Sequence, residues 1–129
     1  MTEDELSVFA GGSAGDTWGD LAQIFAADAE AAAEEGADFH RYLELQQQNP
    51  QLAGRQLVVF SRFEAQMSAL ATSRLGDHPD ARMRGPLMVG CCITAVRVAL
   101  DRWAASDRDG PVRPYVDEAL ALMDPAFRA

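Results

Sequence analysis

The chain has 129 residues, of which 48% are hydrophobic, and this is enough to enclose a core without disulfides or metal ions. Its 20 acidic residues outnumber the 11 basic ones, none of which is lysine, and the net charge is −9. Because nucleic acids are bound through clustered lysine and arginine, this balance argues against them as partners of this chain alone. We therefore expect one globular domain over residues 1–129.

The N-terminal residues are acidic and contain neither the basic nor the apolar segment of a secretory signal. The only cysteines, Cys91 and Cys92, are neighbours in an apolar stretch, where a disulfide between them would need a strained ring. Two reduced, buried thiols are the simpler interpretation, and they favour a cytoplasmic location.

The spacing of apolar residues and of helix-breaking residues predicts helices and no strand. Residues 1–16 form a lead-in with only a weak pattern. A helix is predicted over residues 17–35, where Thr17 and Asp20 approximate a capping box at the start. A shorter helix is predicted over residues 37–48.

Asn49 and Pro50 form the clearest helix start, because asparagine caps a helix and proline tolerates its first position. This helix is predicted to run to Leu75 and to close at Gly76.

Two more helices complete the prediction. The first begins near Asp80 and runs to about Ala105, with a kink or local break expected near Pro86. The second covers about residues 111–123, and Pro125 is expected to stop it. The fold class is therefore an all-α bundle of about five helices.

The stretch Leu87–Trp103 is apolar around almost its whole helical circumference. A helix at the edge of a monomeric bundle needs only one apolar face. The segment between Arg84 and Arg97 is too short to span a bilayer, so no membrane contact is expected. The remaining interpretation is a helix packed by its own chain on one side and by a second copy of the chain on the other.

The sequence contains few residues in patterns that are typical of catalytic or metal-binding sites. The two histidines, His40 and His78, lack the Glu-x-x-His spacing of di-iron bundles. The apolar neighbours of Cys91 and Cys92 would raise a thiol pKa rather than lower it. No phosphate-binding loop, dinucleotide fingerprint or nucleophile motif is present. We therefore expect that the chain is not an enzyme and that it binds neither a metal ion nor a cofactor.

Aromatic and sulfur-containing side chains gather on the facing sides of the predicted helices, and such walls suit an adaptable apolar pocket. The residues expected to line it are Phe25, Phe60, Phe63, Glu64, Met67, Met88, Cys92 and Val96. The residues alone support a pocket and a filled core equally. In a pocket, Glu64, Gln66 or His40 would contact the polar part of a ligand.

Several segments share a pattern of small and apolar residues. They are NPQLAGRQ at a helix start, SRLGDHPDARMR between the two longest helices, and AVRVALDRW and VDEALALM in the last two helices. Together they resemble the C-terminal half of TetR-family transcriptional regulators from actinobacteria. The resemblance covers nearly the whole chain and looks strongest to the subgroup that includes the mycofactocin regulator.

The resemblance implies an all-helical domain that homodimerises through its last two long helices, which form a four-helix interface. It also implies an apolar pocket whose occupancy moves the family's DNA-reading heads apart. On this chain the interface corresponds to residues 86–103 and 111–123. Its expected residues are Leu87, Cys91, Thr94, Ala95, Val98, Tyr115 and Leu122.

The family's three-helix DNA-binding head has no counterpart in these residues, so we expect no operator binding by this chain alone. Either a truncated chain or a naturally headless protein would fit. The expected function is that of the effector-sensing and homodimerisation domain of a TetR-type repressor, with an apolar small molecule as effector. The resemblance allows a lipid-like or acyl-CoA effector, although the scattered arginines offer no phosphate clamp for coenzyme A. The alternative is a pure dimerisation module with a filled core and no ligand.

Overall fold

The computed structural model describes residues 3–34, 48, 50–106 and 110–128. These residues contain no strand, and the predicted all-α class is confirmed. The elements are α1 (Glu3–Ala10), the 3-10 helix η1 (Ala14–Asp16), α2 (Thr17–Glu34), α4 (Pro50–Leu75), α5 (Ala81–Ala105) and α6 (Arg113–Phe127).

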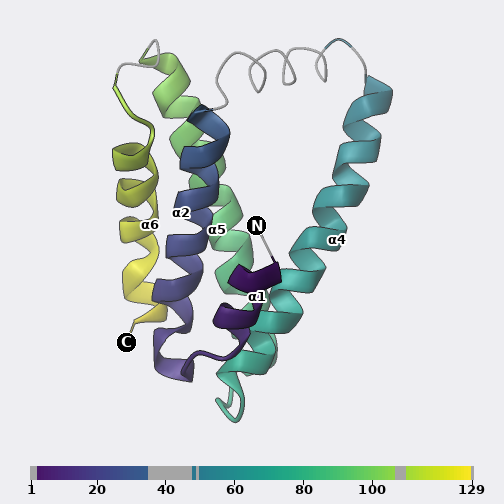
Figure 1. Ribbon diagram of the computed structural model, residues 1–129, viewed down its shortest axis with the longest axis vertical. Helices are drawn as coiled ribbons and strands as arrows, with labels where there is room; N and C mark the ends of the chain where they lie inside the picture. The colour runs from purple at the N-terminus through teal and green to yellow at the C-terminus, as the bar shows by residue number, and fades with distance from the viewer. Residues whose placement is uncertain (1–2, 35–47, 49, 107–109, 129) are drawn as a thin grey trace.

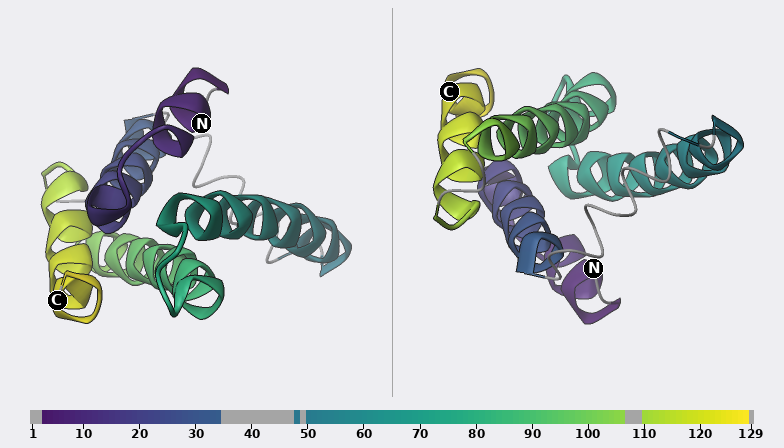
Figure 2. Two further views of the ribbon diagram at one scale, coloured as in Figure 1. Left: turned by 90° about the horizontal axis from the view of Figure 1, so that it is seen from below. Right: turned by 90° about the horizontal axis from the view of Figure 1, so that it is seen from above.

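The helices form an open bundle (Figure 1). α2, α5 and α6 pack against one another, and α4 packs extensively against α5 beside the turn that joins them. Towards its N-terminal end, α4 diverges from α2 and α5, while α1 lies between α2 and the C-terminal half of α4. The views along the bundle place α1 on one side of the molecule and α5 and α6 on the other (Figure 2).

The start of the chain is more ordered than the sequence predicted. The lead-in over residues 1–16 contains α1 and η1, and η1 continues directly into α2. The Thr17 hydroxyl donates a hydrogen bond to the carbonyl oxygen of Ala14 over 2.8 Å, and Asp20 binds Arg74. The predicted capping box is therefore wrong, because both of its side chains have partners outside it.

The predicted ends of α4 and α5 are confirmed where they lie in the described residues. Gly76 closes α4 with a φ of +59°, a left-handed conformation that glycine adopts without steric cost. α5 runs through Pro86 without a break. The predicted helix over residues 37–48 and its neighbour Asn49 lie outside the described residues, apart from the helical Gln48.

The C-terminal helix is longer than predicted. α6 passes Pro125 and ends at Phe127, so the expectation that this proline stops the helix is wrong. Proline removes one hydrogen-bond donor and its ring crowds the carbonyl of the residue four positions earlier, but α6 continues for two more residues. The next turn still closes, because the Arg128 amide donates to the Asp124 carbonyl oxygen over 3.0 Å.

A single buried cluster connects the helices. Its largest fully buried side chains are Trp18, Phe9, Leu21, Met67, Met88, Val89, Val116 and Cys92. Trp18 joins the start of α2 to the end of α6: its ring lies 4.8 Å from that of Phe127, and its indole N–H donates to Asp124. This cluster holds α2, α5 and α6 as a unit, against which α4 is packed.

α5 has the length and composition of a membrane-crossing helix, with 33% of its apolar window buried within the described part of the chain. Such a helix is also typical of the core of a soluble protein. Here α2, α4 and α6 all pack against α5, which favours the core interpretation.

Candidate functional site

The most deeply buried of the residues predicted to line a pocket lie where α4 packs against α5. Met67, Met88 and Cys92 are fully or almost fully buried and belong to the same core cluster. The two helix backbones approach closely at Gly85, where a Cβ atom would lie 2.8 Å from the backbone nitrogen of Thr72. This part of the wall is therefore filled by the chain itself.

The remaining described residues of the predicted wall lie on α2, α4 and α5. Phe63 of α4 meets Phe25 of α2 edge to face, with ring centroids 6.2 Å apart and the planes at 69°. Phe63 and Val96 are half-buried, whereas Phe25 is buried. The side chain of Phe60, one turn earlier on α4, lies outside the described residues.

Two of the three residues that were predicted to contact the polar part of a ligand lie near Phe63 in the sequence of α4. Glu64 and Gln66 are both exposed. The carboxylate of Glu64 lies beside α5, because a Cβ atom on Gly90 would be 3.8 Å from its Oε1 atom. His40 lies outside the described residues. The structure thus brings Glu64 to the seam between α4 and α5.

Cys92 lies in the core, where its thiol has no setting for thiolate chemistry. Burial, with a smaller contribution from the neighbouring Cys91, raises the pKa of the Cys92 thiol to about 12. A thiol with such a pKa carries almost no thiolate at neutral pH, and the thiolate is the reactive form. Among the described residues, no group of three or more potential ligands could hold a metal ion.

Most of the predicted interface residues lie on the surface of α5 and α6. Leu87, Val98 and Leu122 are 52%, 43% and 79% exposed. Thr94 is exposed, and Cys91 and Tyr115 are half-buried. Tyr115 is tied to its own chain, because its hydroxyl donates to Ser106 Oγ over 3.1 Å.

Ala95 requires a correction. It is only 2% exposed and belongs to the core of its own chain. It follows Leu87 by eight residues, which places it about 80° around the helix from that residue. This rotation is enough to turn Ala95 from the exposed face of α5 into the core.

A buried arginine that the local sequence pattern did not predict connects α4 to α1, to α2 and to the residue before η1. The Arg74 side chain of α4 has no exposed surface. Its Nε and Nη1 atoms donate to the carbonyl oxygens of Ser13 (3.0 Å) and Phe9 (3.1 Å), and Nη2 donates to Asp20. The guanidinium also lies 4.7 Å from the centre of the Phe9 ring. Arg74 continues the i, i+4, i+7, i+11 series of Phe63, Met67 and Leu70, which are buried or half-buried, and only this spacing could have indicated its role.

Replacing Arg74 with methionine is expected to lower the free energy of unfolding by about 3 kcal/mol, since two carbonyl oxygens lose their charged donor. Urea denaturation followed by circular dichroism measures the change. Arg82→Met is the matched control, because Arg82 is exposed and its loss is expected to cost less than about 0.5 kcal/mol. Equal midpoints for the two variants would show that the Arg74 contacts do not hold the N-terminal elements.

Comparison with known proteins agrees with this architecture. A family model described as the MftR C-terminal domain matches residues 16–128, which include every described element except α1 and the start of η1. No curated protein and no solved structure matched the chain. Because the family model covers most of the chain, the protein belongs to the TetR-family C-terminal domains of this type.

Proposed function

We propose that this chain is the effector-binding and homodimerisation domain of a TetR-type transcriptional repressor. Its family membership makes it a regulatory domain of transcriptional regulators, which are not enzymes. The finer proposal is that two copies associate through α5 and α6 and that an apolar small molecule binds near Phe63. The chain binds no nucleic acid by itself, needs no cofactor and acts in the cytoplasm.

The observation that carries the proposal is the uncovered apolar face of α5. Leu87 and Val98 are exposed although they belong to the longest apolar segment of the chain, Leu87–Trp103. Residues 87, 91, 94 and 98 recur at the spacing of one helix face. α6, with its exposed Leu122, packs beside α5. A second copy seated on this face would remove these side chains from water, which is the dominant favourable term in association.

The effector site is proposed at the divergence of α4 from α2. The Phe25–Phe63 pair forms its apolar floor, and Val96 lies on the third helix of the junction, α5. Glu64, at the seam between α4 and α5, is proposed to receive the polar group of the ligand. The proposed ligand is a lipid-like molecule or the acyl part of an acyl-CoA, whose apolar chain would complement these apolar side chains.

A second candidate function is a pure dimerisation module with a filled core. It is favoured by the complete burial of Met67 and Cys92 and the near-complete burial of Met88, because these side chains already fill the centre of the predicted pocket wall. In that case the helices would pair without any ligand.

Native mass spectrometry of the purified chain, with a pair of α4 variants, tests the proposal. We expect a dimer that carries additional small-molecule mass. Phe63→Ala is expected to remove this added mass with little loss of stability, since Phe63 is only half-buried. Met67→Ala is expected to cost about 2–5 kcal/mol of stability because it removes a fully buried side chain.

The outcomes separate the two candidate functions. A dimer without added mass, which stays empty when acyl-CoAs and fatty acids are supplied, contradicts the effector site and favours the filled-core module. A monomer contradicts both functions, because each of them needs the α5–α6 face.

A further inference from the structure

The first described residues, 3–16, run from α1 through η1 and lie between α2 and α4 (Figure 1). We call them the N-terminal strap, because α1 contacts both α2 and α4. All of the N-terminal strap except Asp16 precedes the region that the family model matches. The family assignment therefore gives no role to this segment.

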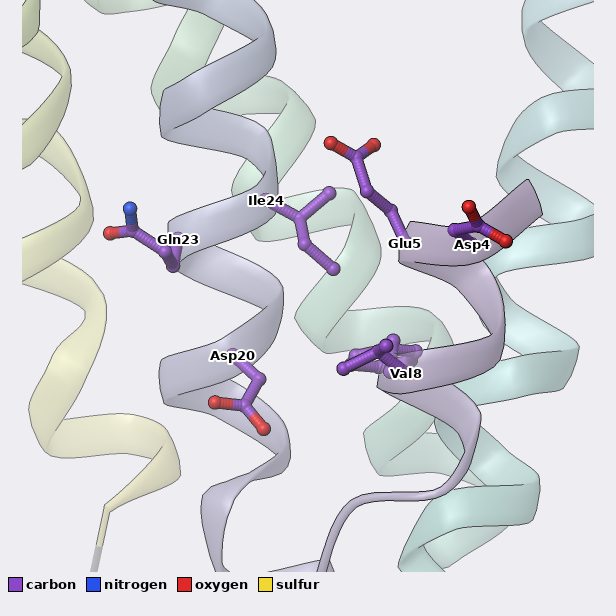
Figure 3. A pocket seen from close by; sticks show the side chains of 7 residues that line it. Asp4, Glu5, Val8, Asp20, Gln23 and Ile24 are labelled. Carbon is purple, nitrogen blue, oxygen red and sulfur yellow. The ribbon is translucent and has the colours of Figure 1, made fainter. Parts of the chain in front are cut away.

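Few apolar contacts hold α1 in place. Phe9 is its only buried residue, and Leu6 is half-buried. Between α1 and α2 lies a groove of about 400 Å³, with Val8 and Ile24 among the residues that line it (Figure 3). Val8 is 78% exposed, so α1 is not closely packed on α2 along this side. Isolated helices shorter than about 12 residues are marginal in water, so we expect the eight-residue α1 to be helical only while it is docked.

Arg74 of α4 holds the turn between α1 and η1, and its side chain has no exposed surface. The guanidinium donates to the carbonyl oxygens of Phe9 and Ser13, on either side of that turn, and to Asp20 of α2. Hydrogen bonds from a charged donor are stronger than those between neutral groups. Because departure of the turn breaks both carbonyl contacts at once, we expect the N-terminal strap to open as one unit.

We propose that the N-terminal strap opens as a unit with Arg74 as its latch, and that its release lets the N-terminal half of α4 move away from α2. The closed strap contacts both helices and so restricts the angle between them. The close contact at Gly85 fixes the other half of α4 to α5, which leaves the movement to the half that diverges. The Phe25–Phe63 pair joins the same two helices, so release of the strap also separates the two rings of the proposed effector site.

Amide hydrogen exchange of the ¹⁵N-labelled chain, followed by NMR, tests the opening. We expect the amides of Phe9, Ala10 and Asp16 to exchange through one shared opening. After correction for intrinsic rates, this exchange is expected to be at least about tenfold faster than that of Val89, which is buried in α5. No ligand is added, so the result does not depend on the proposed effector site.

Gly12→Ala tests the latch without removing the charge of Arg74. The added Cβ atom would lie 2.5 Å from both the Cζ and the Nη2 atom of Arg74, and the buried guanidinium cannot move aside without losing its acceptors. We expect the opening to become about tenfold more frequent. Gly11→Ala is the matched control, because its Cβ atom would meet only backbone oxygens at 3.5 Å and 3.8 Å and neither glycine has a positive φ. We expect wild-type exchange in the control.

Pulsed electron paramagnetic resonance measures whether α4 follows the strap. Nitroxide labels are attached to Ala27→Cys on α2 and Arg62→Cys on α4, which are both exposed positions. The half-buried Cys91 is replaced by serine, while the buried Cys92 stays in place. Labelled chains are diluted with an excess of unlabelled chain, so that only distances within one copy are measured.

A pair of double variants compares an expelled strap with a docked one. Phe9→Asp with Gly12→Ala places a carboxylate in the core beside the disturbed latch, so we expect a predominantly open strap and a second, longer distance between the labels. Val8→Asp with Gly11→Ala adds the same charge at an exposed position and is expected to keep the wild-type distance alone. Far-ultraviolet circular dichroism is expected to show that α2, α4, α5 and α6 stay folded in both.

Four outcomes would overturn the proposal. If the strap amides exchanged no faster than Val89, the strap would open only with the whole domain. Equal exchange in Gly12→Ala and Gly11→Ala would remove the role of the latch. An unchanged distance between the labels in the Phe9/Gly12 variant would show that the strap does not hold α4. Global unfolding of that variant would make the strap a part of the core rather than a separate unit.

Discussion

Gly85→Ala is expected to destabilise the protein by about 3 kcal/mol, although alanine favours a helix more than glycine does. The added Cβ atom would lie 2.8 Å from the Thr72 backbone nitrogen and 3.0 Å from the Thr72 Cα atom. A backbone cannot rotate out of the way as a side chain can, so α4 and α5 must move apart. Thermal or urea denaturation of the variant measures the loss.

Gly90→Ala is the control for this prediction, because it makes the same change five residues later in the same helix. A Cβ atom there would meet only the Oε1 atom of Glu64, at 3.8 Å, which is an ordinary contact. We expect it to leave stability unchanged or to raise it by up to about 1 kcal/mol through helix propensity. If the two alanine variants had the same stability, α4 and α5 would not meet at Gly85 as closely as described.

Leu87→Glu combined with Leu122→Glu is expected to convert the proposed homodimer to a monomer. In a two-fold symmetric interface each change occurs twice, so four carboxylates would have to be buried without partners. We expect the dimer dissociation constant to rise at least about 100-fold. Sedimentation equilibrium measures it, and the far-ultraviolet circular dichroism is expected to stay unchanged because both side chains are exposed in the single chain.

Val8→Glu is the control for the dimer prediction. Val8 is 78% exposed, as Leu122 is at 79%, but it lies on α1, on the opposite side of the molecule (Figure 2). This variant is expected to keep the wild-type dimer affinity. A Leu87/Leu122 variant that remains dimeric would move the interface away from the α5–α6 face.

If the Gly85 prediction holds, the two halves of α4 differ in how firmly they are held by the rest of the chain. The close contact at Gly85 fixes the C-terminal half of α4 to α5, while the N-terminal half of α4 diverges from α2 and α5. Arg74 also fixes α1 and η1 to the same end of α4. A ligand that displaces the diverging half of α4 would therefore act on a helix whose other end is clamped to the core.

The sequence by itself determined the helical class, the extent of α4 and its closure at Gly76. These features follow from local rules: apolar residues at helical spacing, a proline at the first position of a helix and a glycine that tolerates a positive φ. The excess of apolar residues in α5 could also be predicted, because it depends only on which residue types are distributed around the circumference of one helix.

Only the tertiary structure decided which of these apolar residues of α5 are exposed to solvent and which are packed in the core. Ala95 and Leu87 look equivalent in the sequence, but α5 is turned so that Ala95 is packed in the core and Leu87 is exposed. The role of Arg74 could not be read either, because its partners Phe9 and Ser13 are more than sixty residues away in the chain. α1 and the α1–α2 groove exist for the same reason: short segments with weak local patterns become ordered when long-range contacts stabilise them.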